Sequence, residues 1–222
     1  MPHVLKRPST GPADNIALDE ALFQELERSG APETLSIWES PQTVVVLGAT
    51  GTIDQYIHEE ACRKDGVLIL RRRSGGGAVV IGPGCLNYSL VLSMAARPEL
   101  YGVTDSYHLI LKRMVQTLGL PGLAIRGICD LAIGDRKISG NSQRRGRHAL
   151  LHHGTILYDF NAQLMQRYLK DAPRQPAYRS GRSHLNFVTN SSLTREATVQ
   201  AITLAYRDWP IAHSAESVRM RI

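Results

Sequence analysis

The sequence has few cysteines and no long apolar run. Three cysteines occur among its 222 residues, Cys62, Cys85 and Cys129, and no two of them are close together. This odd, scattered set does not fit the disulfide framework of a small secreted domain, so we expect a reducing cytoplasm as the compartment. The apolar runs are far shorter than the ~20 residues that span a bilayer, and no apolar signal segment follows the first residues. We therefore expect no membrane association.

The sequence also lacks internal repeats, low-complexity segments and the Cys/His spacing of a zinc site. Its composition is that of a globular protein, with 43% hydrophobic residues, which predicts a single domain over residues 1–222. The net charge of +6 is explained by an anionic substrate or an acidic protein partner, so we expect no nucleic-acid partner. The densest basic run, residues 144–148, predicts a solvated hairpin loop, with docking of an acidic partner as the alternative.

The most informative stretch is an apolar run that leads into arginines and three consecutive glycines. Residues 67–70 precede Arg71-Arg72-Arg73-Ser74-Gly75-Gly76-Gly77-Ala78, and apolar residues resume at Val79. This order predicts a strand, a tight loop and a second strand. Glycines bring backbone N–H groups close to a ligand, and arginines add fixed positive charge. We expect a carboxylate or phosphate against this loop, with a flexible basic hairpin as the alternative.

A second motif places Gly134-Asp135 between two short alternating runs. Glycine at the first of two loop positions predicts a type II′ hairpin turn. The register that follows from this turn pairs Ile133 with Arg136, Ala132 with Lys137, Leu131 with Ile138, and Asp130 with Ser139.

Strand alternation gives this hairpin a polar face and an apolar face. Asp130 and Lys137 would lie diagonally opposed on the polar face, and the small Ala132 would leave room between them. The polar face predicts a ligand pocket, with an ordinary cross-strand ion pair as the alternative. Ser139 and Asn141 would share the polar face, while Leu131 and Ile138 would form the other.

Adjacent histidines follow in His152-His153-Gly154-Thr155, within an apolar stretch that predicts a strand. In a strand the two side chains point to opposite faces, so they do not jointly bind one metal ion. We expect one histidine to be buried and hydrogen-bonded and the other to line a pocket. Gly154 marks a close approach of the backbone to another group.

Hydrophobic periodicity and turn residues predict both helices and short strands. Helices are expected at residues 14–28, with Asp14 as N-cap and Gly30 as the stop, and at 55–64, 104–118, 162–169 and 194–209. Strands are expected at 34–39, 43–48, 67–72, 78–81, 86–92, 130–133, 136–141 and 150–159. Residues 172–190 predict an irregular surface loop near the site. Because most strands adjoin through hairpins, we expect an α+β fold with a mixed, largely antiparallel sheet flanked by helices.

Together these motifs resemble the lipoate–protein ligase family, which shares its fold with biotin–protein ligases and octanoyltransferases. The family carries Arg-Arg-x-Ser-Gly-Gly-Gly-Ala-Val, an Asp-Leu strand, Arg-Lys-x-Ser-Gly and His-His-Gly-Thr, in that order. The chain has these motifs at residues 71–79, 130–131, 136–140 and 152–155, and residues 15–21 resemble the family's opening helix. The resemblance spans roughly residues 13 to 190 and implies the catalytic-domain fold of this family.

The resemblance implies an enzyme that transfers an acyl group in two steps. Lipoate and ATP, with Mg²⁺, would form lipoyl-AMP, and the lipoyl group would pass to a lysine of an acceptor lipoyl domain or an H-protein-like carrier. Lys137 would contact the carboxyl oxygen and the phosphate in both steps, in an electrostatic role. Asp130 would lie near the adenylate, through a metal ion or a water molecule.

The resemblance also implies a larger binding set around these two residues. Arg72 and the glycine loop would hold the acyl and phosphate region, and polar residues from neighbouring strands would bind the adenylate. The expected set comprises Arg72, Ser74, Gly75, Gly76, Gly77, Ala78, Asn87, Asp130, Ser139, Gly140, Asn141, Ser142, His153, Gly154 and Thr155.

The chain departs from the family pattern in three places. Ile81-Gly82 replaces a His-Asp pair, and Cys85 replaces an asparagine. The chain also ends at Ile222, ahead of the C-terminal accessory domain of many bacterial ligases, which is a separate chain in some relatives. We therefore expect a divergent branch without that domain, and a separate accessory chain is an open alternative.

The alternative function is an octanoyl or lipoyl transferase that works through an acyl-cysteine without ATP. Cys129 is the candidate nucleophile, but strand alternation would turn its side chain away from the polar face. By resemblance, octanoyltransferases carry their cysteine near positions that hold Gly122 and Leu150 in this chain. A non-enzymatic binder and a biotin ligase are more distant alternatives. The acceptor protein, the choice between lipoate and octanoate, and the oligomeric state are left open.

Overall fold

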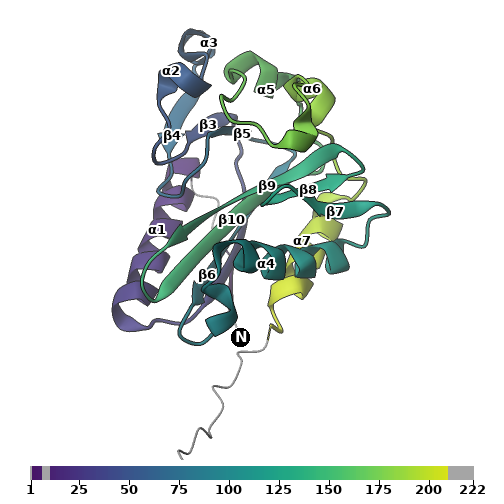
Figure 1. Cartoon of the computed structure of the whole chain (residues 1–222). Helices are drawn as coiled ribbons and strands as arrows, with labels where there is room; N and C mark the ends of the chain where they lie inside the picture. Colours follow the sequence, from purple (N-terminus) through teal and green to yellow (C-terminus); the bar gives the residue numbers. More distant parts are fainter. Residues whose placement is uncertain (1, 7–10, 210–222) are drawn as a thin grey trace, which may run out of the picture.

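Two β-sheets and the helices around them form the protein (Figure 1). The computed structural model describes residues 2–6 and 11–209. Most strand pairs in these described ranges are antiparallel, whereas the pairs β1–β2 and β3–β4 are parallel. The expected α+β fold with largely antiparallel pairing is therefore confirmed, although the strands form two sheets rather than one.

The large sheet has seven strands in the order β1-β2-β6-β10-β9-β8-β7. It holds the hairpin and the double-histidine motif on adjacent strands. Its strands are β1 (His3–Lys6), β2 (Thr34–Glu39), β6 (Cys85–Ser93), β10 (Ala149–Leu157), β9 (Arg136–Arg145), β8 (Asp130–Ile133) and β7 (Leu123–Arg126).

The small sheet has the order β4-β3-β5, with β3 (Val44–Leu47) between β4 (Leu68–Arg71) and β5 (Ala78–Ile81). The glycine motif is therefore not the turn of a β-hairpin, because β4 and β5 each pair with β3 instead of with each other. The loop crosses the end of β3. Gly48 meets it there, since a Cβ on Gly48 would lie 2.0 Å from the Gly76 carbonyl oxygen.

Helices cover both faces of the large sheet (Figure 1). Helix α1 (Pro12–Ser29) packs against β6 and β10, while α4 (Val103–Leu118) packs against α7 (Arg195–Tyr206) on the other side. Strand β6 is buried along nearly its whole length because both of its faces are covered. Alternate β6 residues, Leu86, Tyr88, Leu90 and Leu92, belong to the core beneath α4 and α7.

Short helices surround the small sheet at the top of Figure 1. A second core joins this sheet to the helices, and Cys85 and Leu157 of the large sheet contribute to it. The helices are α2 (Ile53–Tyr56), α3 (Glu59–Asp65), α5 (Gln163–Tyr168) and α6 (His184–Phe187), with 3₁₀ turns η1 (Pro98–Leu100) and η2 (Ala177–Arg179) elsewhere.

Several expected elements differ in detail. Helix α1 begins after Gly11 rather than after Asp14, and it ends as predicted at Gly30, whose φ of 69° is left-handed. The helix expected at residues 55–64 is broken into α2 and α3. The short edge strands β1 and β7 are not among the predicted strands. None of the helices in the described part of the chain has the length and apolarity needed to cross a bilayer.

Candidate active site

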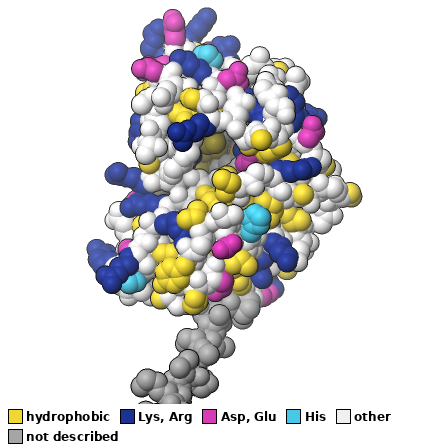
Figure 2. All heavy atoms as spheres, in the orientation of Figure 1, with side chains coloured by type: hydrophobic (Ala, Val, Ile, Leu, Met, Phe, Trp, Pro, Cys, Tyr) yellow, Lys and Arg dark blue, Asp and Glu magenta, His cyan; other side chains and the backbone are white. Residues whose placement is uncertain are grey.

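A cavity of about 700 Å³ lies where the two sheets meet. Its wall includes residues of the glycine loop, β3, β5, β6, β8, β9, β10, helix α1 and a segment that we call the strap, residues 171–190. Every predicted site residue contributes to this wall except Ser74 and Gly75. The face shown in Figure 2 carries Lys and Arg side chains on both sides of a central region with hydrophobic side chains. The tertiary structure thus brings the separate sequence motifs to one place.

An ion pair between Lys137 and Asp130 lies in this wall. The Lys137 Nζ atom is 2.7 Å from Asp130 Oδ1, and the Lys137 side chain is 27% exposed while that of Asp130 is 9% exposed. The hydroxyl of Tyr178 donates to Asp130 Oδ2 at 2.8 Å. Burial and the Asp130 carboxylate raise the pKa of Tyr178, so its hydroxyl keeps the proton that it donates. The ammonium group is therefore oriented by a carboxylate and still reaches the cavity.

The β8–β9 hairpin has the predicted turn but a shifted register. Ile133 pairs with Arg136 and Ala132 with Lys137, as expected. A bulge between Leu131 and Ala132 then moves the remaining pairs by one residue, so Asp130 faces Gly140 and Leu131 faces Ser139. The predicted pairs of Leu131 with Ile138 and Asp130 with Ser139 are therefore wrong. The bulge leaves Leu131 and Ile138 in the core, as predicted.

Gly140 is required by the side chain of Lys137. A Cβ at position 140 would lie 2.7 Å from Lys137 Nζ and 2.8 Å from its Cε. Any larger residue would push the ammonium group away from Asp130. The glycine that follows serine in the motif thus leaves space for the Lys137 side chain, and Gly140 also lines the cavity.

The side chain of Arg72 joins the glycine loop to β3 through hydrogen bonds. Its guanidinium group donates to Val46 O, to Ser74 Oγ and to Gly75 O, at 3.1, 3.0 and 2.7 Å. Burial lowers its pKa to about 10, so the group is still a cation at neutral pH. Ser142 Oγ also donates to Gly75 O, at 2.9 Å.

The glycine loop keeps unused donors. In the described part of the chain, the backbone N–H groups of Gly75 and Gly76 donate to no other group. Gly76 has a φ of 91°, a conformation that favours glycine. Gly77 approaches Tyr56 closely, because a Cβ there would lie 2.8 Å from the ring. The loop can therefore present N–H groups and a nearby cation to an oxyanion.

The two adjacent histidines take the two predicted roles. His152 is fully buried, with Nε2 3.2 Å from the Tyr88 hydroxyl and Nδ1 3.2 Å from Gln143 Nε2. His153 lines the cavity, and its Nε2 is 2.5 Å from Ser74 Oγ. The Nδ1 of His153 lies 3.8 Å from Asp19 Oδ2 on α1.

Asn141 serves mainly to join strands. Its Oδ1 accepts from the Tyr88 hydroxyl at 2.5 Å, and its Nδ2 donates to Cys129 O at 2.7 Å and to Ser139 Oγ at 3.1 Å. Gly154 makes room for it, because a Cβ at position 154 would lie 1.8 Å from Asn141 Oδ1. The predicted close approach at Gly154 is thus an approach of the Asn141 side chain.

Asn87 and Thr155 form a buried polar edge of the cavity. The Asn87 amide donates weakly to Trp38 O and Cys85 O, at 3.4 and 3.3 Å. Thr155 makes a side-chain hydrogen bond with Cys85, whose pKa burial raises to about 12. Cys85 is therefore an inert thiol.

Cys129 lies in a turn ahead of β8, so strand alternation does not govern its side chain. The residue is half-buried and contributes to the cavity wall, contrary to the expectation that it would point away. Burial raises the pKa of the thiol, and the Asp130 charge raises it further. A thiol in this setting is a poor nucleophile.

The residues of the cavity do not form a metal site by themselves. No group of three or more His, Cys, Asp or Glu side chains that could hold a metal ion occurs among residues 2–6 and 11–209. Both carboxylate oxygens of Asp130 already accept from Lys137 and Tyr178. Binding of Mg²⁺ through Asp130 stays a prediction.

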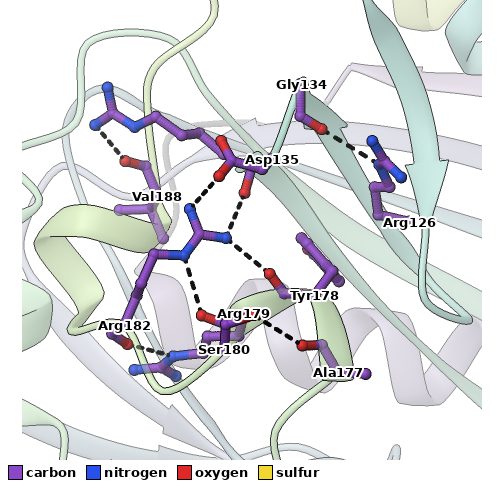
Figure 3. A network of polar contacts seen from close by, with 10 residues as sticks. Arg126, Gly134, Asp135, Ala177, Tyr178, Arg179, Ser180, Arg182 and Val188 are labelled. Carbon is purple, nitrogen blue, oxygen red and sulfur yellow. Dashed lines mark hydrogen bonds and ion pairs between the residues drawn. The ribbon is translucent and has the colours of Figure 1, made fainter.

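The strap forms part of the cavity wall and is held by the arginine contacts in Figure 3. Arg182 donates to the Asp135 carboxylate, to Asp135 O, to Tyr178 O and to Arg179 O. Arg136 donates to Val188 O, and Thr189 N donates to the carbonyl of Lys137. The predicted loop near the site is thus ordered by the β8–β9 turn, and it includes η2 and α6.

Sequence reasoning missed the cavity residues that come from distant segments. Asp19 lies in the segment that resembles the family's opening helix, but the residues next to it in the sequence do not predict that its side chain lines a cavity. A stretch with no regular periodicity supplies the buried cavity residue Arg179 and also Tyr178, which donates to Asp130 from outside the cavity lining. The basic run at 144–148 is not a free loop, because Arg145 donates to Leu100 O and Tyr101 O.

The family model of the lipoyl protein ligase A/B catalytic domain matches residues 11–207. A candidate lipoate-protein ligase A of Aeropyrum pernix is 34% identical over 157 residues, which are 69% of this chain and 56% of that protein. The chain thus spans little more than half the length of this relative.

Two solved structures share the fold. A structure from a study of a bi-partite lipoate protein ligase and its E2 lipoyl domain, from Thermoplasma acidophilum, has a TM-score of 0.77 and 21% identity, covering 92% of this chain and 81% of that one. A lipoate-protein ligase A bound with ATP has a TM-score of 0.72 and 21% identity, covering 92% and 83%. At 21% identity, these two structures show a shared fold and no more. The family model, in contrast, matches nearly the whole described chain. The chain belongs to the family of lipoyl protein ligase A/B catalytic domains.

Proposed function

We propose that the protein is an ATP-dependent lipoate–protein ligase. It activates lipoate to lipoyl-AMP and transfers the lipoyl group to a lysine of a lipoyl domain or an H-protein-like carrier. One observation carries the proposal: the Lys137 ammonium group and the glycine loop with its free N–H groups share the wall of a single cavity.

The cavity suits an acyl adenylate in size and polarity. Its volume of about 700 Å³ falls within the usual range for small-molecule sites. The small sheet supplies apolar wall, including Val46, Val79 and Ile81, and Leu157 adds to it from β10. Each methylene of an acyl chain that is buried there would favour binding by about 0.8 kcal/mol. Polar residues line the cavity from the glycine loop, β6, β8, β9, β10, α1 and the strap.

In the first step, a carboxylate oxygen of lipoate attacks the α-phosphorus of ATP and pyrophosphate leaves. Negative charge accumulates on the non-bridging phosphate oxygens as the new bond forms. Lys137 and the N–H group of Gly76, both in the cavity wall, can stabilise that charge, and the buried Arg72 holds the loop in position. Lys137 needs no proton transfer for this role.

In the second step, the amine of an acceptor lysine attacks the acyl carbon and AMP leaves. The same ammonium group can stabilise the oxyanion that forms on the acyl carbon, since it already lies at the carboxyl–phosphate junction in this arrangement. No described residue of the chain needs to form a covalent intermediate. The raised pKa of the Cys129 thiol argues against an acyl-cysteine route.

The deciding experiment mixes the protein with lipoate, ATP, Mg²⁺ and a lipoyl domain, and weighs the domain by mass spectrometry. We expect the domain to gain the mass of one lipoyl group, and pyrophosphate to be released even before the domain is added. A parallel reaction replaces lipoate and ATP by an octanoyl carrier protein. A mass gain in that reaction alone, lost in Cys129→Ser, would establish the transferase instead.

A further inference from the structure

Ser74, His153 and Asp19 come from three separate elements and form one polar chain beside the cavity. Ser74 opens the glycine loop, His153 lies on β10 and Asp19 on α1. The contacts are 2.5 Å from Ser74 Oγ to His153 Nε2 and 3.8 Å from His153 Nδ1 to Asp19 Oδ2. Asp19 is 5% exposed and Ser74 1% exposed.

The arrangement has the residue types of a serine-hydrolase triad, but the contacts of Ser74 exclude that role. Its hydroxyl oxygen already accepts from Arg72 Nε at 3.0 Å, and the residue does not contribute to the cavity wall. A substrate in the cavity cannot reach it. The contacts among Ser74, His153 and Asp19 must therefore affect the conformation of the glycine loop itself.

The known donors determine which atom donates and which accepts at each of these contacts. Because the Arg72 guanidinium group always donates, Ser74 Oγ uses one lone pair to accept from it, and the hydroxyl proton needs another acceptor. His153 Nε2 is the acceptor within reach in the described part of the chain. His153 must then carry its proton on Nδ1, the atom that faces the Asp19 carboxylate.

The Asp19 carboxylate is itself held in place by the large sheet. Ser89 Oγ donates to Asp19 Oδ1 at 2.6 Å. Ser89 on β6 is the direct cross-strand partner of His153 on β10, so both side chains face α1. The carboxylate lies over this pair, where it favours the tautomer of His153 with Nδ1 protonated.

We propose that Asp19 and His153 are positioning residues that hold the glycine loop in its anion-binding conformation through Ser74. The inference rests on the proposed function for its kinetic consequence, but not for its structural one. The Ser74 carbonyl accepts from Ala49 N and the Gly77 carbonyl from Gly48 N, each at 2.9 Å. These two amides therefore report whether the loop stays attached to β3.

The test uses Asp19→Asn, Ser74→Ala and the double variant. An asparagine at position 19 can donate to His153 Nδ1, which favours the opposite tautomer and leaves the Ser74 hydroxyl proton without its acceptor. Glu20→Gln is the matched control, since it makes the same chemical change one residue along α1, where Glu20 pairs with Arg144 of β9 and not with His153.

We expect each single variant to lower kcat for lipoate-dependent pyrophosphate release about tenfold, with little change in KM for ATP. The double variant should be no slower than the slower single variant, because both changes break the same chain of contacts. Amide hydrogen exchange at Gly48 and Ala49 should become faster in all three, and both readouts should be unchanged in Glu20→Gln.

A double variant whose kcat is lowered about a hundredfold, the product of two tenfold effects, would overturn the proposal. Unchanged amide hydrogen exchange at Gly48 and Ala49 would overturn it too. Covalent labelling of Ser74 by a fluorophosphonate would also overturn it. If the unmodified protein releases no pyrophosphate, the proposed function fails, and hydrogen exchange still decides the positioning role by itself.

Discussion

At the scale of single residues, Lys137 owes its position to its neighbours rather than to its own strand. Asp130 pairs with its ammonium group, Tyr178 holds the other carboxylate oxygen, and Gly140 leaves the space that the side chain occupies. Strand alternation alone places Lys137 on a face, whereas these three contacts aim it into the cavity. Loss of the cation should therefore affect chemistry more than folding.

We expect Lys137→Ala to lower the rate of lipoyl-AMP formation by at least about a hundredfold, because the developing phosphate charge loses its cation. Pyrophosphate release measures this rate. The melting temperature should change by no more than about 3 °C, since the side chain is partly exposed. Lys112→Ala on α4, at an exposed position, is the control. Near-normal turnover in Lys137→Ala would remove this residue from the mechanism.

Gly154→Ala should destabilise the protein by about 1–3 kcal/mol, because its Cβ would overlap Asn141 Oδ1 and break the contact between Asn141 and Tyr88. Urea unfolding measures the change. Gly75→Ala is the matched comparison, because a Cβ at that position meets nothing within 4 Å. Equal stability of the two variants would contradict the role given to Gly154.

At the scale of elements, the strap and the β8–β9 turn act as one unit. Arg182 joins them by donating to the carboxylate and the carbonyl of Asp135, and it also donates to two carbonyls within the strap (Figure 3). Such an arginine matters for the local order of the strap more than for global stability, since exposed ion pairs contribute little to the free energy of unfolding. The same unit carries Tyr178 to Asp130 and Val188 to Lys137, so its order bears directly on the site.

Arg182→Ala should loosen the strap without unfolding the protein. We expect faster amide exchange at Thr189, whose N–H donates to the Lys137 carbonyl, and a slower release of pyrophosphate. Arg126→Ala is the control, because Arg126 donates to Gly134 O in the same turn instead of to a strap residue. If both variants show the same exchange, the turn rather than the arginine link orders the strap.

At the scale of the whole molecule, the buried His152 couples stability to pH. Burial lowers the pKa of His152 to about 3, and the charge of His153 adds to the effect. An unfolded histidine has a pKa of about 6.5. Between about pH 6.5 and pH 3 the unfolded chain thus binds a proton that the folded protein does not. The free energy of unfolding therefore falls as the pH falls through this range.

His152→Gln should remove this contribution, which amounts to about 1.4 kcal/mol per pH unit. We expect the variant to be less stable than the unmodified protein at pH 7, where its contacts with Tyr88 and Gln143 are changed, but to lose less stability between pH 6 and pH 4. Urea unfolding at several pH values measures the slope. His108→Gln, at an exposed position on α4, should leave the slope as it is; a parallel slope for His152→Gln would refute the assignment.

Much of the site could be predicted because its motifs are local. Three consecutive glycines predicted a loop with open N–H groups, and Gly134-Asp135 predicted the turn that puts Lys137 near Asp130. Alternation also assigned the two histidines to opposite faces. The β-bulge escaped prediction, since the preference for a bulge depends on the packing of Leu131 and Ile138 in the core rather than on their sequence.

The sequence by itself determined the local elements, the faces of the strands and the residue types that the family uses, because period, turn chemistry and motif spacing act over a few residues. Only the tertiary structure decided that β3 lies between β4 and β5, that Asp19 reaches His153, and that Tyr178 reaches Asp130. These contacts join segments far apart in the chain. They are set by how two sheets and a strap pack around one cavity, and no short pattern encodes that packing.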